Sequence, residues 1–137
     1  MIDKASFLAI YKNTNYIIPE LHTKIKIDEL NAIIDSELLK SNHSYWAFIS
    51  AANPFSKEIS DQENEFNFLK LKNLIDAQFP KYFEGYGEGQ LGWKNEKSIL
   101  IFGITEEQAI KIGKQFGQNA IVVGVRNEPS KIIWLQD

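Results

Sequence analysis

The residues whose types and positions could do chemistry in this chain are mainly amides. Asn53 ends an apolar run, and Asn64 lies in the first turn of an expected helix. Gln118 and Asn119 lead together into another apolar run. Amides pair donors with acceptors but are poor acids and bases, so this set suits recognition of a polar ligand better than proton transfer. Each amide also has a structural interpretation, because Asn before Pro commonly begins a turn and buried amides can bond loop backbone.

A glycine-rich segment over 85–92 is the second feature, and it contains Gly87, Gly89 and Gln90. Glycines between a strand and a helix are typical of dinucleotide sites, but here they precede another apolar strand and predict a hairpin connection. Glycine tolerates positive φ and close approach of other groups. We therefore expect this segment to cover a ligand or to contact another part of the chain.

Carboxylates could supply acid–base or metal chemistry. Glu63 and Glu88 are the candidate acids or bases, although Ser60 and Glu63 have the spacing of a helix capping box. Together with Glu58 and Asp61 they could gather and bind Mg²⁺ through oxygen, but their spacing matches no known motif. The chain has no Cys and two His, which disfavours zinc sites, and no cofactor is evident.

Composition restricts the class of protein. The 137 residues are 44% hydrophobic and 24% charged, which is typical of a globular domain and excludes disorder and coiled coil. The net charge of −3 argues against a dedicated nucleic-acid-binding protein. No apolar run approaches the roughly 20 residues of a membrane helix, and the first residues lack a signal-peptide core. We expect a cytoplasmic protein with one domain over 1–137, divided into N-terminal helices and short strands (1–44) and an α/β core (45–137).

Hydrophobic periodicity and turn residues predict the elements that position these side chains. The expected helices span 3–13, 28–40, 61–78 and 105–116, the first capped by Asp3 and the second by Asp28. The expected strands span 16–18, 24–27, 45–49, 82–83, 99–102, 120–125 and 132–135.

From residue 45 the order is β-α-β-β-α-β over 45–125, which predicts an α+β fold with a ferredoxin-like core and an added C-terminal strand. Two right-handed crossovers would put both helices on one face of an antiparallel sheet. The core strands are apolar on both alternate sets of positions, so the second face must also be covered. We favour the N-terminal helical portion over a second subunit as the cover.

This topology brings distant segments to one end of the sheet. There the loop 51–60 should meet the glycine-rich segment, the N-terminus of helix 61–78 and the start of strand 120–125. The last core strand pairs beside the first in this fold, so Asn53 should lie near Gln118 and Asn119. The helix N-terminus at that end favours anions.

Three segments carry a family resemblance, and a pattern near the N-terminus fits as well. These are Ala47-Phe48-Ile49-Ser50-Ala51-Ala52-Asn53-Pro54, Glu63-Asn64, Phe116-Gly117-Gln118-Asn119-Ala120-Ile121 and Tyr11-x-x-Thr14-x-Tyr16. As a set they resemble the bacterial family called domain of unknown function 3293, over about residues 5–135. The resemblance implies a bacterial, cytoplasmic, stand-alone domain with no established activity, and it marks the four amides as motif positions. The family often has a large residue where this chain has Ala52, which implies a more open pocket.

Three functions remain open. The first is binding of a small polar or phosphorylated ligand, such as a nucleotide, through the amides with the glycine-rich segment as lid. The second is an enzyme that uses Glu63 or Glu88 or carboxylate-bound Mg²⁺ on such a ligand. The third is a protein–protein module, including self-association through the edge of the last strand at 132–135. A membrane partner is not expected, and nucleic acid is disfavoured by charge.

Overall fold

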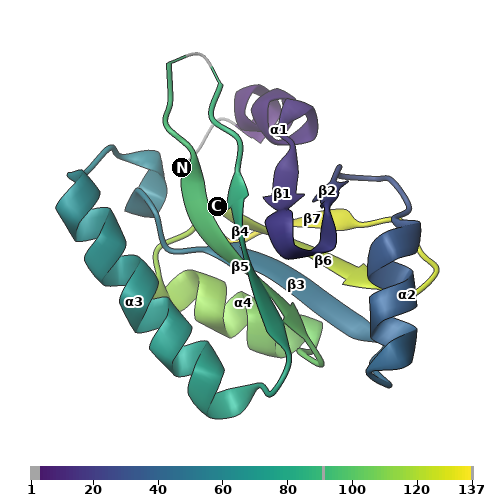
Figure 1. Cartoon of the computed structure of the whole chain (residues 1–137). Coiled ribbons are helices and arrows are strands. Elements are labelled where there is room, and N and C mark those ends of the chain that lie inside the picture. The colour runs from purple at the N-terminus through teal and green to yellow at the C-terminus, as the bar shows by residue number, and fades with distance from the viewer. Residues whose placement is uncertain (1–3, 91, 137) are drawn as a thin grey trace.

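The computed structural model describes residues 4–90 and 92–136, which form helices and strands in mixed order (Figure 1). The N-terminal elements are α1 (Lys4–Asn13), β1 (Tyr16–Ile18), the short 3₁₀ turn η1 (Pro19–Leu21), β2 (Thr23–Ile25) and α2 (Ala32–Lys40). The remaining elements are β3 (Tyr45–Ser50), η2 (Pro54–Ser56), α3 (Asp61–Gln78), β4 (Tyr82–Gly87), β5 (Glu96–Phe102), α4 (Glu106–Gln115), β6 (Ala120–Val125) and β7 (Lys131–Trp134).

Within these described residues the strands form one seven-stranded sheet in the order β2-β1-β4-β5-β3-β6-β7. Every neighbouring pair is antiparallel. The α+β class predicted from the sequence is confirmed. The predicted pairing of the last core strand beside the first is also observed, since Phe48 of β3 lies opposite Val122 of β6.

One face of the sheet packs against α3 and α4. Ala47 and Ile49 of β3 point to this side, where Leu71 and Ile75 of α3 and Ile112 of α4 are buried against them. α4 begins at a capping box in which Thr105 accepts from the Gln108 amide. This helix therefore starts within one residue of the predicted position, because capping residues and apolar spacing agree.

The opposite face is covered by the N-terminal part of the chain. Trp46 and Phe48 of β3 point to this side, with Ile18 of β1 and Ile34 and Leu38 of α2 packed over them. The expected N-terminal cover is therefore present, but its composition differs from the prediction. The β1–β2 hairpin and α2 form most of it, and α1 contributes no fully buried residue.

The sheet curls until the segments beyond its two edges meet. The Asp28 amide donates to the Ser130 carbonyl (3.0 Å), and the Ser130 amide donates to the Glu29 carbonyl (3.1 Å). Tyr11 of α1 packs edge-on against Trp134 of β7, with ring centres 5.6 Å apart. These contacts partly cover the β7 edge that was considered for self-association.

Several predicted boundaries are wrong. α2 starts after Asn31, whose side chain accepts from the Ile34 amide, and not after Asp28, which has φ 68° and pairs with Ser130 instead. Strand β2 covers residues 23–25 and not 24–27. Strand β4 continues to Gly87, so the first three residues of the predicted glycine-rich loop are strand. The predicted cap Asp3 lies outside the described residues.

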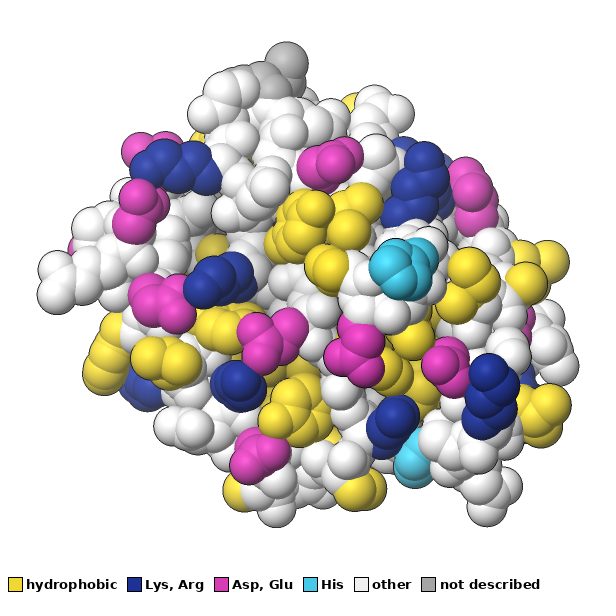
Figure 2. All heavy atoms as spheres, viewed as in Figure 1, with side chains coloured by type: hydrophobic (Ala, Val, Ile, Leu, Met, Phe, Trp, Pro, Cys, Tyr) yellow, Lys and Arg dark blue, Asp and Glu magenta, His cyan; other side chains and the backbone are white. Residues whose placement is uncertain are grey.

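The described surface mixes both signs of charge. In Figure 2, acidic and basic side chains intermingle across the visible face without forming a one-sign patch. Lys72 pairs with Glu84 (2.8 Å) and Lys97 pairs with Glu65 (2.7 Å). Among the described residues, no helix has the length and apolar character required to cross a membrane.

Candidate functional site

One end of the curled sheet gathers the segments that carry the candidate residues. There β3 and β4 end, while β5 and β6 begin, because neighbouring strands run in opposite directions. The turn after β3 lies against the turn before β6, since the Phe55 amide donates to the Gly117 carbonyl (2.7 Å). A Cβ on Gly117 would lie 2.9 Å from Pro54, so glycine is needed for this close approach.

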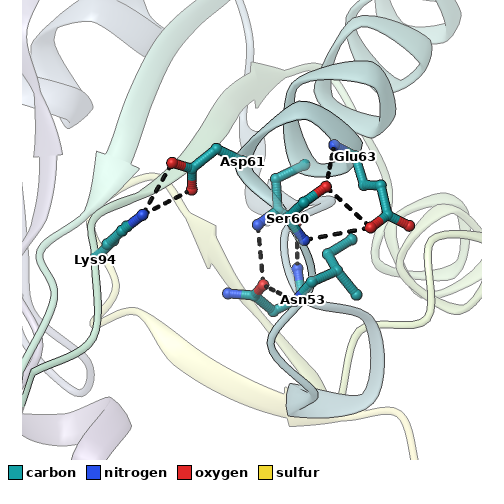
Figure 3. A network of polar contacts seen from close by, with 7 residues as sticks. Asn53, Ser60, Asp61, Glu63 and Lys94 are labelled. Carbon is teal, nitrogen blue, oxygen red and sulfur yellow. Dashed lines mark hydrogen bonds and ion pairs between the residues drawn. The ribbon is translucent and has the colours of Figure 1, made fainter.

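Asn53 is the centre of a hydrogen-bond network at this end (Figure 3). Its backbone amide donates to Asn64 Oδ1 (2.8 Å), and its Oδ1 accepts from Asn64 Nδ2 (2.9 Å) and from the Ile59 amide (3.2 Å). Its Nδ2 donates to Glu96 Oε2 (2.8 Å). Asn53 has φ 43° and ψ 64°, a left-handed conformation that Asn tolerates better than most residues. The Asn53 and Asn64 amides thus hold the β3–α3 turn in place.

Gln118 and Asn119 attach the start of β6 to the same turn. Gln118 Nε2 donates to the Ala52 carbonyl (3.1 Å) and to the Phe116 carbonyl (3.3 Å). Asn119 Nδ2 donates to Ser56 Oγ (2.6 Å). The structure therefore brings all four predicted amides into one neighbourhood.

Asn119 differs from the other amides in one respect. Its residue is 3% exposed, and its Oδ1 is buried without any hydrogen-bond partner in the described structure. A buried acceptor without a donor costs about 1–3 kcal/mol. Buried polar atoms in native proteins nearly always have partners, so the Asn119 oxygen is an acceptor that the described residues leave unused.

Asn119 lines a cavity of about 140 Å³ at this end of the sheet, here called the sheet-end cavity. Its walls come from α1, the turn after β3, the β4–β5 connection and the start of β6. The lining residues used below are Tyr11, Tyr16, Ala52, Trp93, Glu96 and Gln118. Predicted site residues Asn53, Gly87, Gly89, Gln90 and Glu88 also line it, whereas Asn64 and Glu63 do not.

The glycine-rich segment is fastened to the α1–β1 connection across this cavity. Gln90 Nε2 donates to Thr14 Oγ1 (2.6 Å) and to the Ile10 carbonyl (3.1 Å). Glu88 Oε1 accepts from Asn15 Nδ2 (2.9 Å). Gly89 has no room for a side chain, since a Cβ would collide with the Trp93 carbonyl. Residues 88–90 of this segment are therefore held beside the cavity, and glycine is required at position 89.

Glu96 is the only carboxylate that combines cavity lining with substantial burial among the described residues. Burial raises the pKa of Glu96 above its usual value near 4.5, while the hydrogen bond from Asn53 acts in the opposite direction. No Lys or Arg of the described chain forms an ion pair with it, because Lys94 binds Asp61 (2.9 Å) and Lys97 binds Glu65. Glu96 is thus a negative charge without a counter-ion.

The two tyrosines of the cavity are held neutral. Burial and the negative charge of Glu96 raise the pKa of Tyr11 to about 12, against a hydrogen bond with Ser56. Burial chiefly raises the pKa of Tyr16 as well, and its hydroxyl donates to the Tyr11 carbonyl (3.3 Å). Neither phenol is therefore a base near neutral pH.

The predicted acid–base carboxylates lie in other environments. Glu63 is exposed and completes the capping box with Ser60, which accepts from the Glu63 amide (3.1 Å; Figure 3). Asp61 forms its ion pair with Lys94 at the surface (Figure 3). Glu88 is exposed at the cavity rim. Within the described part of the chain, no three Asp, Glu, His or Cys side chains are grouped to hold a metal ion, so the structure offers no support for the magnesium hypothesis.

A second, larger cavity of about 740 Å³ lies beside the N-terminus of α3. Two of its polar residues already have partners, since Asn64 binds Asn53 and Asp61 binds Lys94. The Ser60 side chain accepts from the Glu63 amide at the helix N-terminus that was expected to attract anions, which leaves one free N–H group fewer there. This cavity therefore has fewer unmet polar groups to offer a ligand, although it shares Ala52 and Glu96 with the sheet-end cavity.

Sequence reasoning missed Glu96 and Trp93 as cavity residues. Glu96 lies three residues before the strand predicted at 99–102, where a charged residue is normally solvated. Its position opposite Gly87 in the β4–β5 ladder is the signal that a correct hairpin register would have revealed. Tyr11 and Tyr16 entered only through the family resemblance.

Residues 49–121 of this chain match the model of a protein family described as "Protein of unknown function (DUF3293)". The match spans β3 to the first residues of β6 and thus includes Asn53, Glu96 and Asn119. No curated protein and no solved structure matches the chain significantly. Because that match covers more than half of the chain, the chain belongs to the DUF3293 family.

Proposed function

We propose that this protein binds a small polar molecule in the sheet-end cavity. The observation that carries the proposal is the buried, unpartnered Oδ1 of Asn119, a residue that lines this cavity. A ligand donor at this oxygen would remove a cost of about 1–3 kcal/mol that the free protein bears. Concave sites with mostly apolar walls and a few converging polar groups are the common form of small-molecule sites.

The amides support this function indirectly. Asn53 and Asn64 use their side-chain groups on each other, on Ile59 and on Glu96. They therefore position Glu96 and the turn rather than offering groups to a ligand. The residues that face the ligand are then Glu96, Gln118 and Asn119, together with the rings of Tyr11 and Tyr16.

The fold supports a site at this place. We infer a ferredoxin-like core from the order β4-β5-β3-β6, extended by β7 on one side and by β1 and β2 on the other. At the open end of a curled sheet, the side chains of the strands leave part of the interior unfilled. Ligand sites often lie at such openings, here called the mouth of the sheet. α1 covers this mouth without burying any residue completely.

A thermal-shift screen against small metabolites, including amines, nucleotides and sugar phosphates, tests the proposal. A ligand at 100 times its dissociation constant stabilises by about 2.7 kcal/mol. For 137 residues this corresponds to a rise in melting temperature of about 9 °C.

A cavity-filling variant assigns any shift to the cavity. A Cβ on Gly87 would meet Tyr16 and Thr14 at 3.7–3.9 Å, an ordinary contact, so Gly87→Leu should fold and occupy the space. Tyr86→Leu is the matched control, because Tyr86 is adjacent in β4 and lines neither cavity described above. Loss of the shift in Gly87→Leu alone is expected, and a shift that persists in this variant would refute the proposal.

A further inference from the structure

We propose that the ligand of the sheet-end cavity is a small cation that carries N–H donors, such as a primary amine or a guanidine, bound by Glu96 and Asn119. This inference rests on the proposed function and specifies its ligand class. It replaces the phosphorylated ligand that the sequence favoured.

The side-chain amide donors of Asn53, Gln118 and Asn119 are already used within the protein. Asn53 Nδ2 donates to Glu96 and Asn119 Nδ2 donates to Ser56. Gln118 Nε2 donates to the Ala52 and Phe116 carbonyls.

Three further donors of the cavity lining are used in the same way. The Tyr16 hydroxyl donates to the Tyr11 carbonyl, and the Thr14 hydroxyl donates to the Ile10 carbonyl (2.7 Å). Gln90 donates to Thr14 and to the Ile10 carbonyl. A ligand that consists mainly of acceptors, such as a phosphate, would therefore find few free donors.

The acceptors around the cavity remain available. Asn119 Oδ1 has no partner. Within the described part of the chain, Gln118 Oε1 accepts no hydrogen bond, and Glu96 accepts only the bond from Asn53 at Oε2. These three acceptor oxygens belong to residues that line the cavity, and they suit a group with several N–H donors, because ammonium has three and guanidinium has five.

Charge points to the same ligand class. Glu96 is a partly buried carboxylate whose described surroundings supply an amide but no cation. Lys94, the only Lys or Arg among the residues lining the sheet-end cavity, is bound to Asp61 through both carboxylate oxygens (2.9 and 3.1 Å). Buried charges in proteins are normally paired. A cationic ligand would therefore supply the counter-ion that Glu96 lacks, whereas Glu96 would repel an anion.

The remaining walls and the volume suit a small organic cation. Phe7, Tyr11, Tyr16 and Trp93 line the cavity. Aromatic faces attract cations within about 6 Å of the ring centre. A volume of about 140 Å³ lies below the range of about 300–1,000 Å³ typical of drug-sized ligands. The ligand, or the part of it that enters, is therefore only a few atoms across.

Four probes of similar shape separate charge from size: n-butylamine, n-butylguanidine, 1-butanol and butyrate. Binding is followed by titration of the full chain, with the Trp93 indole and Asn119 side-chain amide signals in ¹H–¹⁵N spectra as local reporters. We expect the amine and the guanidine to bind about tenfold or more tightly than 1-butanol, the difference between charged and neutral hydrogen bonds. Butyrate is expected not to bind.

Two variants and one control test the residues. Glu96→Gln keeps an acceptor for Asn53 and removes the charge, and it should weaken amine binding about tenfold. Asn119→Leu removes the unpartnered oxygen and should also weaken it. Glu107→Gln is the matched control, since Glu107 lies in the first turn of α4, lines neither cavity and should leave binding unchanged.

The outcomes separate the two proposals. If 1-butanol or butyrate binds as tightly as the amine, and Gly87→Leu abolishes this binding, the cavity binds ligands but the cationic assignment is wrong. Amine binding that is unchanged in both Glu96→Gln and Asn119→Leu overturns the assignment as well. If no probe binds, or if binding persists in Gly87→Leu, the proposed function itself fails.

Discussion

Substitution of Asn53 tests the hydrogen-bond network that shapes the candidate site. Asn53→Ala removes three side-chain hydrogen bonds and leaves the Ile59 amide, Asn64 Nδ2 and Glu96 Oε2 without this partner. At about 1 kcal/mol for each bond the loss is about 3 kcal/mol. Alanine in the left-handed conformation of residue 53 adds about 1 kcal/mol.

Asn53→Gly separates the two contributions. Glycine loses the same hydrogen bonds but adopts φ 43° without steric cost, so the expected loss is about 3 kcal/mol against about 4 kcal/mol for alanine. An unfolding entropy of about 0.29 kcal/mol/K for 137 residues converts these losses to about 10 °C and 14 °C in melting temperature. Asn73→Ala is the control, because Asn73 is an exposed residue of α3.

Urea unfolding followed by tryptophan fluorescence measures both free energies. A loss below about 1 kcal/mol for Asn53→Ala would show that the network contributes little to stability. Equal losses for the alanine and glycine variants would show that the backbone conformation of residue 53 carries no strain. Either result refutes the corresponding step of the reasoning.

Three further predictions concern other parts of the structure. Burial raises the pKa of Glu96 above its usual value near 4.5. The protonated Glu96 side chain therefore contributes stability that is complete below about pH 4.5 and is lost as the pH rises through the raised pKa. Glu96→Gln should unfold at a higher urea concentration than the wild type at pH 7 but not at pH 4. Gly124→Ala should destabilise by about 1–3 kcal/mol, because its Cβ would collide with the buried Trp46 ring, whereas Gly87→Ala, with contacts of 3.7 Å or more, should be nearly neutral in the same melts. Gln90→Ala should raise amide hydrogen exchange in α1 about fivefold or more, since the bonds from Gln90 to the Ile10 carbonyl of α1 and to Thr14 just after this helix are lost. Unchanged exchange there would exclude this fastening.

The helices show how far local sequence can predict the fold. α4 was predicted closely because Thr105 and Gln108 form a capping box and the apolar spacing agrees with it. For α2, Asp28 and Asn31 are equally good caps by residue type. Which of the two caps α2 depends on Ser130, whose carbonyl accepts from the Asp28 amide. Ser130 lies about a hundred residues further along the chain, so the local sequence cannot distinguish the two caps.

The glycine-rich segment shows the same limitation in a strand. Glycines favour a loop by propensity, yet Gly85 and Gly87 extend β4. The reason is β1, which pairs with this part of β4 and places the Ile17 carbonyl 2.5 Å from where a Gly85 Cβ would be. Glycine is required by the neighbouring strand here, a long-range cause that residue type alone does not reveal.

The position of the site could be predicted better than the roles of its residues. Strand order alone predicted that Asn53 would lie near Gln118 and Asn119, and these two amides donate to Ala52 and Ser56 in the turn that contains Asn53. Which groups remain free depends on individual hydrogen bonds. Glu96 and Asn53 were not expected to meet, because their contact joins residues 43 positions apart.

The structural amides and the proposed binding groups should have opposite effects on the stability of the free protein. The difference follows from how many of their hydrogen-bonding atoms have partners. Asn53 has its side-chain oxygen and nitrogen in hydrogen bonds, so its removal should only destabilise. Glu96 lacks a counter-ion and Asn119 Oδ1 lacks a donor, so each lowers stability in the free protein. Groups that cost stability persist where a function needs them, a recognised trade-off at binding and catalytic sites. Glu96→Gln should therefore stabilise the free chain and weaken the binding of a cation, a combination that a purely structural role for Glu96 does not predict.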